Sequence, residues 1–129
     1  MPKTIRQTAT FKATPHEVYE MLLDSKKHSK FSGEKASISR KIGGKFSAYG
    51  GYCMGTNLEL LEDKKIVQAW RGSDWKEGHF SKATFTLTKV KNGTRLSFTQ
   101  SNVPDKHYEQ IKHGWIEFYW EKMKAALEE

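Results

Sequence analysis

The sequence has one cysteine, Cys53, which therefore has no partner for a disulfide within the chain. It also has no run of about 18 apolar residues, the length that a helix needs to span a bilayer. Its first residues lack the apolar stretch of a secretory signal peptide. These absences predict a cytoplasmic protein without a membrane segment, in a reducing compartment where free thiols are usual.

The motifs of several enzyme classes are absent as well. The five histidines stand apart, without a His-x-x-x-His or Cys-x-x-Cys pair, so we expect no metal site. Neither a Gly-x-Ser-x-Gly elbow nor a glycine motif for phosphates or dinucleotides occurs, and no cofactor is predicted. Cys53 is interpreted as an inert, partly buried thiol. None of these motifs therefore indicates a catalytic residue.

What the sequence does have is apolar material for one core and an excess of positive charge. Its 129 residues, 36% of them hydrophobic, fit a single domain over residues 1–129. The net charge is +7, and residues 26–45 carry seven basic side chains against one carboxylate, Glu34. Such a segment suits an acidic protein or a phosphate-rich ligand, or it is simply a solvated face. Specific nucleic-acid binding is not expected, because no base-stacking strand motif or basic recognition helix accompanies the charge.

The first part of the chain predicts one strand followed by two short helices. Residues 3–12 alternate in polarity, as the residues of a half-buried strand do. Thr14, Pro15 and Glu17 then supply an N-cap, a first-turn proline and the acid of a capping box, which together mark a helix start. A second helical turn is expected around residues 25–31, with a glycine after it.

Strand and turn signals alternate through the middle of the chain. The clearest turn is Asn92-Gly93, a pair that favours the left-handed backbone of a two-residue hairpin loop. Six strands are predicted around this and the other turns: residues 36–39, 45–49, 52–61, 65–72, 79–91 and 94–101.

The end of the chain predicts one long amphipathic helix over residues 105–129. Its apolar side chains recur at three- and four-residue spacing: Ile111, Trp115, Phe118, Tyr119, Met123 and Leu127. The expected fold class is therefore α+β, with a curved antiparallel sheet of about six or seven strands wrapped around a long C-terminal helix and two short helices after strand one. A helix that lies across such a sheet leaves a space between them, and this space is the predicted site.

Strand alternation and the helical stripe select the side chains that face this space. The predicted walls of a hydrophobic ligand cavity are Leu58, Ile66, Trp70, Phe85, Leu87, Phe98, Trp115, Phe118 and Tyr119. The predicted rim consists of Tyr49, Tyr52, Arg71 and Trp75. There the arginine is suited to pair with a carboxylate, and the two tyrosines flank glycines that would let their loop act as a lid. The alternative is that these side chains fill the space as a solid core.

Short motifs along the chain carry a family resemblance. They stand in this order: Gly43-Gly44-Lys45-Phe46, Ile66-Val67-Gln68-Ala69-Trp70-Arg71, Asp74-Trp75, Glu77-Gly78-His79, Gly93-Thr94-Arg95-Leu96 and Gly114-Trp115. In this order and spacing the sequence resembles the homologue family of the activator of the ninety-kilodalton heat-shock chaperone ATPase. The family is part of the START-like, or SRPBCC, superfamily, and the resemblance covers nearly the whole chain.

The resemblance implies a helix-grip fold of the START-like and Bet v-like kind, whose members often enclose a hydrophobic ligand cavity. In full-length eukaryotic activators this is the C-terminal type of domain, and a separate N-terminal domain supplies much of the chaperone contact. The implied partners are a small hydrophobic molecule and a heat-shock chaperone or another acidic protein. We therefore expect a non-enzymatic ligand-binding domain with a co-chaperone or stress-response role.

One enzymatic alternative stays open, because some helix-grip relatives are cyclases or dehydratases that act through polar residues in the cavity. The positions for such chemistry in this chain are Gln68, Gln100, His79 and Glu117. A buried Glu117 with a raised pKa would act as an acid or a base, whereas a solvated Glu117 would not.

Overall fold

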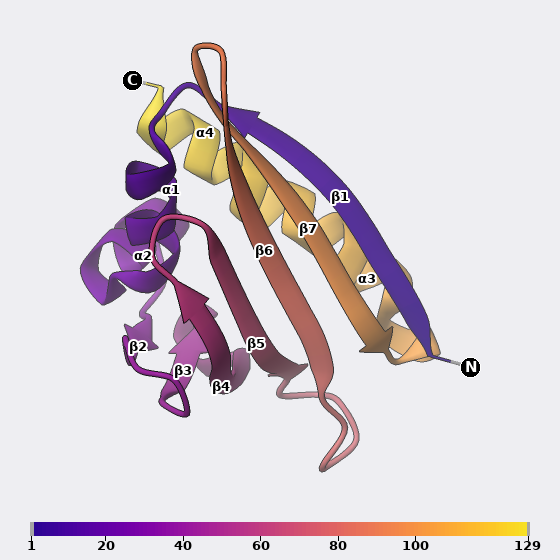
Figure 1. The fold of residues 1–129 in the computed structure, drawn as a ribbon. Helices are drawn as coiled ribbons and strands as arrows, with labels where there is room; N and C mark the ends of the chain where they lie inside the picture. The colour runs from indigo at the N-terminus through magenta and orange to yellow at the C-terminus, as the bar shows by residue number, and fades with distance from the viewer. Residues whose placement is uncertain (1, 129) are drawn as a thin grey trace.

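The chain forms one antiparallel sheet with a long helical stretch behind it (Figure 1). The computed structural model describes residues 2–128, so Met1 and Glu129, which the predicted domain and final helix include, lie outside the described part. The strands are β1 (Lys3–Phe11), β2 (Ser37–Ile38), β3 (Lys45–Ala48), β4 (Cys53–Leu61), β5 (Lys65–Gly72), β6 (Ser81–Val90) and β7 (Gly93–Val103). Two short helices, α1 (Pro15–Leu23) and α2 (Ser25–Ser32), stand between β1 and β2, and the 3-10 turn η1 (Tyr49–Gly51) stands between β3 and β4.

The C-terminal stretch runs along one face of the sheet. It consists of η2 (Asp105–His107), α3 (Tyr108–Gly114), the π-helix η3 (Trp115–Trp120) and α4 (Glu121–Leu127). The strand order is β1-β7-β6-β5-β4-β3-β2, and all neighbouring strands are antiparallel. In Figure 1, α3 lies behind β1 and β7, while α1 and α2 gather near α4. This arrangement confirms the predicted α+β helix-grip fold, with seven strands.

The first short helix begins, and the second ends, where the sequence predicts. Thr14 Oγ1 accepts a hydrogen bond from the Glu17 N–H at 3.1 Å, and the Glu17 carboxylate accepts one from the Thr14 N–H at 2.9 Å. This reciprocal pair is the predicted capping box. Asp24 caps α2 through the Lys27 N–H at 3.0 Å. Gly33 ends α2 with a φ of 74°, a left-handed conformation that glycine adopts without strain.

The β6–β7 hairpin is present, but its turn lies one residue earlier than predicted. Val90 pairs with Gly93, so the turn residues are Lys91 and Asn92, and Asn92 has a φ of 70°. Gly93 belongs to β7, where a Cβ atom would lie 2.0 Å from the carbonyl oxygen of Phe11. The glycine thus allows the backbones of β7 and β1 to approach each other closely. This is a tertiary contact, and the turn preference of the Asn-Gly pair does not predict it.

The C-terminal helix keeps its direction but changes its winding at η3. Gly114 and Glu121, which flank this segment, have right-handed helical backbone angles, so the helix is not interrupted. A π-helix takes more residues per turn, which shifts the inward face along the sequence. Trp120 is therefore buried, with 4% of its surface exposed, whereas Phe118, predicted to face inward, is 44% exposed. The prediction assumed a regular 3.6-residue period and for this reason missed Trp120.

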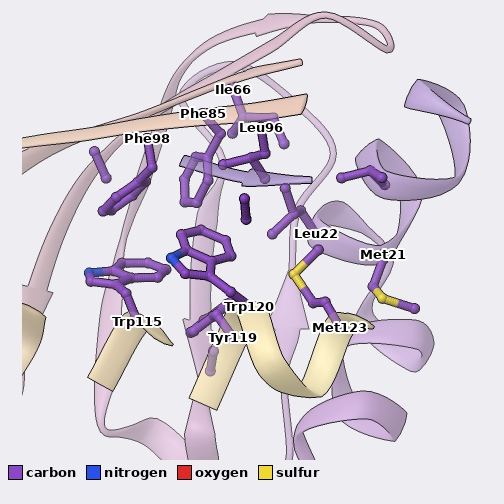
Figure 2. Packing of buried hydrophobic residues seen from close by; sticks show 14 of the residues in the cluster. Met21, Leu22, Ile66, Phe85, Leu96, Phe98, Trp115, Tyr119, Trp120 and Met123 are labelled. Atoms are coloured by element: carbon purple, nitrogen blue, oxygen red, sulfur yellow. The ribbon is translucent and has the colours of Figure 1, made fainter. Parts of the chain in front are cut away.

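Two buried tryptophans fasten this helix to the sheet (Figure 2). Trp115 Nε1 donates a hydrogen bond to Gln100 Oε1 on β7 at 2.7 Å. Trp120 Nε1 donates to Gln7 Oε1 on β1, also at 2.7 Å. The two indole rings stack with their centres 5.5 Å apart, and both pack against the ring of Phe98. Each indole therefore buries its apolar surface while its N–H keeps an acceptor.

We predict that Gln100→Leu lowers the free energy of unfolding by roughly 1–3 kcal/mol, because it leaves the buried Trp115 N–H without an acceptor. It also removes the amide that donates to Ser81 Oγ at 2.9 Å. Urea denaturation measures the loss. In a double-mutant cycle with Trp115→Phe, the two losses should sum to more than the loss in the double variant, because both changes break the same hydrogen bond. Strict additivity would show that this bond contributes nothing.

Candidate functional site

An open pocket lies where η1 meets the C-terminal helix, and its walls are mostly aromatic and aliphatic. Its volume is about 280 Å³, close to the lower end of the range of about 300–1,000 Å³ that is usual for small-molecule sites. We call it the apolar pocket. The residues that line it are Tyr49, Tyr52, Cys53, Trp70, Gln110, Ile111, Gly114, Trp115, Phe118 and Tyr119.

The strained segment η1 (Tyr49–Gly51) forms one wall of the apolar pocket. Tyr49, Gly50 and Gly51 have φ angles of 53°, 65° and 97°, and this left-handed region is unfavourable for a tyrosine. The Tyr49 hydroxyl donates a hydrogen bond to the carbonyl oxygen of Phe118. Its ring centre lies 5.8 Å from that of Phe118 and 5.4 Å from that of Tyr119. These contacts hold η1 against the helix and offset the strain at Tyr49.

A buried polar group of three side chains lies in and behind the pocket wall. His28 Nε2 and Tyr119 Oη are 3.0 Å apart. Burial lowers the pKa of His28 to about 4, so its imidazole is neutral at pH 7. Burial also raises the pKa of the Cys53 thiol to about 12 and the pKa of Tyr119 well above its usual value. All three groups are therefore uncharged at neutral pH.

The four positions named for enzymatic chemistry do not line the apolar pocket. Gln68 and Gln100 are buried, and each is hydrogen-bonded to a neighbouring side chain. His79 forms a hydrogen bond with a backbone carbonyl at 2.9 Å, and Glu117 is exposed. Within residues 2–128, no three His, Cys, Asp or Glu side chains come together in an arrangement that would hold a metal ion.

A membrane-spanning helix would have to be both long and strongly apolar. None of the helices that the structure describes in residues 2–128 meets both conditions.

The predicted cavity separates into an open pocket and a packed core. Ile66 and Phe85 lie around a second, much smaller space of about 20 Å³, which is enough for about one water molecule. Leu87 and Phe98 belong to the buried core of the domain. The predicted wall and rim residues that do meet in the apolar pocket are Tyr49, Tyr52, Trp70, Trp115, Phe118 and Tyr119.

Three predicted positions lie elsewhere. Leu58 is 48% exposed, because a bulge in β4 breaks the alternation of the strand and leaves this side chain on the outer face. Trp75, predicted on the rim, is only 4% exposed and packs against Trp70 with ring centres 5.4 Å apart. Arg71 donates a hydrogen bond to the carbonyl oxygen of Trp75 at 2.6 Å. It therefore holds the loop after β5 in place and does not line the pocket.

Four pocket residues escape the sequence-based prediction of site residues. Gln110 and Gly114 lie eight and four residues before Phe118, so helical spacing from that residue was a signal that pointed to them. Ile111 stands in the same relation to Trp115. Cys53 reaches the pocket because η1 turns the chain just before β4, and no local sequence pattern indicates this.

Comparison with known sequences identifies a family and longer relatives. The family described as "Activator of Hsp90 ATPase homolog 1-like protein" matches residues 12–128. The human "Activator of 90 kDa heat shock protein ATPase homolog 1" is 35% identical over 120 residues, which are 92% of this chain and 35% of that protein. A homologous activator from Dictyostelium discoideum is 30% identical over 126 residues, 97% of this chain and 33% of that protein. The chain thus spans about a third of the length of the curated relatives it matches.

Solved structures have the same fold. An HSP90 activator from Plasmodium falciparum aligns with a TM-score of 0.90 at 28% identity, over 96% of this chain and 95% of that chain. A protein from Chromobacterium violaceum aligns with a TM-score of 0.82 at 27% identity, over 100% of this chain and 99% of that chain. The family resemblance seen in the short motifs and the helix-grip fold are both confirmed.

We predict that His28 makes the protein less stable as the pH falls from 7 to 4.5. The pKa of the imidazole is about 4 in the folded protein and 6.5 for the free side chain, so between these values only the unfolded chain binds the proton. The His28→Gln variant should therefore lose about 2 kcal/mol less unfolding free energy over this pH interval than the unchanged protein. Urea denaturation at both pH values measures the difference.

The matched control for this measurement is His113→Gln, at an exposed histidine. Its stability should follow that of the unchanged protein at both pH values. If His28→Gln shows the same loss as the other two proteins, the pKa of His28 is not lowered in the folded state.

Proposed function

The chain belongs to the Activator of Hsp90 ATPase homolog 1-like family, and on that premise we propose that it is a non-enzymatic domain that binds a small hydrophobic molecule in its apolar pocket. The observation that carries this proposal is the open space of about 280 Å³ between η1 and the C-terminal helix. We infer a second role as well, which is to assist a heat-shock chaperone.

The walls of the apolar pocket suit an uncharged ligand with apolar or aromatic surface. The rings of Trp70 and Trp115 lie 5.6 Å apart, with Tyr49 and Tyr119 on the same pocket. Aromatic faces of this kind bury large apolar areas of a ligand. Cys53 and the tyrosines are neutral at pH 7, because the ordinary pKa values of a thiol and a phenol lie above 7 and burial raises them further. No charge in the walls therefore calls for an opposite charge on the ligand.

The segment η1 is the part of the wall that is best suited to open. Tyr49 is held to the helix by one hydrogen bond and by ring contacts, and its neighbours Gly50 and Gly51 bring no side chains to the contact. Breaking the bond between Tyr49 and Phe118 relieves the backbone strain at Tyr49. The segment η1 thus serves as a lid, as predicted from the tyrosines on either side of Gly50 and Gly51.

The enzymatic alternative has no specific observation in its favour. The positions that it needs, Gln68, Gln100, His79 and Glu117, do not line the apolar pocket. The two glutamines already hold neighbouring side chains in the core. We therefore favour binding without catalysis over cyclase or dehydratase chemistry.

We predict that Gly114→Leu blocks the apolar pocket without harming the fold. Gly114 lines the pocket, has helical backbone angles, and offers a Cβ atom no contact within 4 Å other than Phe118 Cδ2 at 3.8 Å. Replacing a helical glycine should raise the free energy of unfolding by about 0.5–1 kcal/mol. Native mass spectrometry, compared with the denatured mass, should show a co-purified apolar molecule in the unchanged protein and none in the variant.

An added uncharged dye, phenylnaphthylamine, gives a second readout of the same prediction. Its affinity should fall at least roughly tenfold in Gly114→Leu, and much less in Gly114→Ala, which adds a single methyl group. Leu58→Ala is the control on the outer face of the sheet and should leave dye binding unchanged. Unchanged dye binding by a well-folded Gly114→Leu protein would overturn the assignment of the pocket.

The chaperone role is supported by the names of the relatives. The human and Dictyostelium relatives are activators of the 90 kDa heat shock protein ATPase. Because this chain spans about a third of their length, we propose this activity for the domain and do not transfer it from the whole relatives. The net charge of +7 also suits an acidic partner surface.

We predict that the purified chain raises the ATPase rate of a 90 kDa heat-shock chaperone in a coupled assay. The rise should be smaller than that given by the human relative, since the chain matches only 35% of that protein. The human relative and its own chaperone serve as the positive control. If the control responds and the chain leaves the rate unchanged, the chaperone role is wrong, while the binding of a ligand in the pocket is judged separately by the dye.

A further inference from the structure

A second concave surface lies between the short helices and the end of the chain. It is a groove of about 520 Å³ formed by α1, α2 and α4, which lie on one side of the molecule in Figure 1. We call it the basic groove. Its lining residues are Glu17, Met21, Lys27, Lys30, Phe31, Lys122, Ala125, Ala126 and Leu127. Unlike the apolar pocket, it combines an apolar floor with charged edges.

The floor of the basic groove is made of apolar side chains from three helices. Met21 on α1 and Phe31 at the end of α2 are each 9% exposed, so they close the bottom of the groove. Ala125 and Ala126 are exposed on α4, and Leu127 is half-buried beside them. An aliphatic side chain of a partner would bury apolar area against this floor.

The edges of the groove carry three lysine side chains and therefore a net positive charge. Lys27 and Lys30 come from α2, and Lys122 comes from α4, where its Nζ donates a hydrogen bond to the carbonyl oxygen of Ser32 at 3.2 Å. Within residues 2–128, none of these three ammonium groups lies within 4.0 Å of a carboxylate. The one acidic residue on the lining, Glu17, takes part in the capping box of α1. Its pKa is lowered first by its hydrogen bonds with Thr14 and also by the charge of Lys27, so it partly offsets that one lysine.

We propose that the basic groove binds an acidic peptide segment of a partner protein. Carboxylates of the segment pair with Lys27, Lys30 and Lys122, and an aliphatic side chain enters between Phe31 and Leu127. Charge complementarity at the edges and a desolvated apolar contact at the centre are the usual division of a protein interface. A nucleic acid would use the lysines but not the apolar floor, since Phe31 is buried and no exposed aromatic ring lines the groove for base stacking. The proposal depends on neither the apolar pocket nor the chaperone activity.

Fluorescence anisotropy with a labelled synthetic peptide tests the proposal on the whole chain. The peptide is rich in glutamate and carries two leucines on one helical face. We expect saturable binding that weakens as the salt concentration rises, because exposed ion pairs are screened. A peptide with glutamines in place of the glutamates, and another with glycines in place of the leucines, should each bind at least roughly tenfold more weakly.

Variants of the chain locate the binding. Lys30→Glu combined with Lys122→Glu should weaken binding at least roughly tenfold. The control pair, Lys82→Glu with Lys91→Glu, changes the net charge equally at exposed positions away from the groove and should leave binding nearly unchanged. Leu127→Ala should also weaken binding, whereas Leu58→Ala on the outer face of the sheet should not. Circular dichroism verifies that each variant is folded.

Three results would overturn the proposal. One is that the groove pair and the control pair of substitutions weaken peptide binding equally, because the effect would then come from net charge alone. Another is the absence of saturable binding, or binding that is indifferent to the leucines of the peptide. The third is binding of a single-stranded oligonucleotide, or of vesicles of phosphatidylcholine and phosphatidylserine, more tightly than the acidic peptide at the same salt concentration.

Discussion

The hydrogen bonds from two tryptophans to two glutamines determine where the C-terminal helix lies, and the apolar pocket depends on that position. Gln100 on β7 and Gln7 on β1 stand on paired strands, so Trp115 and Trp120 both anchor the helix at this side of the sheet. Further along the sheet, the pocket is also lined by Cys53 on β4, Trp70 on β5 and Tyr49 in η1. The uncovered space between these contacts is the pocket.

The π-helical winding makes this double anchor possible. Residues five apart in an α-helix point roughly 140° away from each other, so Trp115 and Trp120 could not both face the sheet in a regular helix. The wider winding of η3 brings both indoles onto one face. The same winding moves Phe118 outward, where its ring lines the pocket and its carbonyl accepts the Tyr49 hydroxyl. The stability of the fold and the shape of the pocket thus rest on the same irregular turn.

The two proposed binding surfaces use successive parts of one helical stretch. Six residues between positions 110 and 119 line the apolar pocket, and four residues between positions 122 and 127 line the basic groove. The first surface is lined by uncharged side chains, whereas the edges of the second carry Lys27, Lys30 and Lys122. Lys122 forms its hydrogen bond with the end of α2 and so connects the C-terminal helix to the short helices that complete the groove. A ligand in one surface and a peptide in the other would therefore contact the same element.

Patterns between neighbouring residues were sufficient to predict the strands, the capping box, the end of α2 and the α+β class, because local backbone preferences and side-chain periodicity decide these features. Six of the ten residues that line the apolar pocket were named from the same patterns. The rest depends on contacts between distant parts of the chain. Gly93 lies in β7 because the backbone of Phe11 passes beside it, and the bulge in β4 places Leu58 outside. Trp120 faces inward because the π-helical winding turns it toward the sheet, where Gln7 on β1 accepts its N–H. No window of sequence contains both partners of such contacts, so only the tertiary structure decides them.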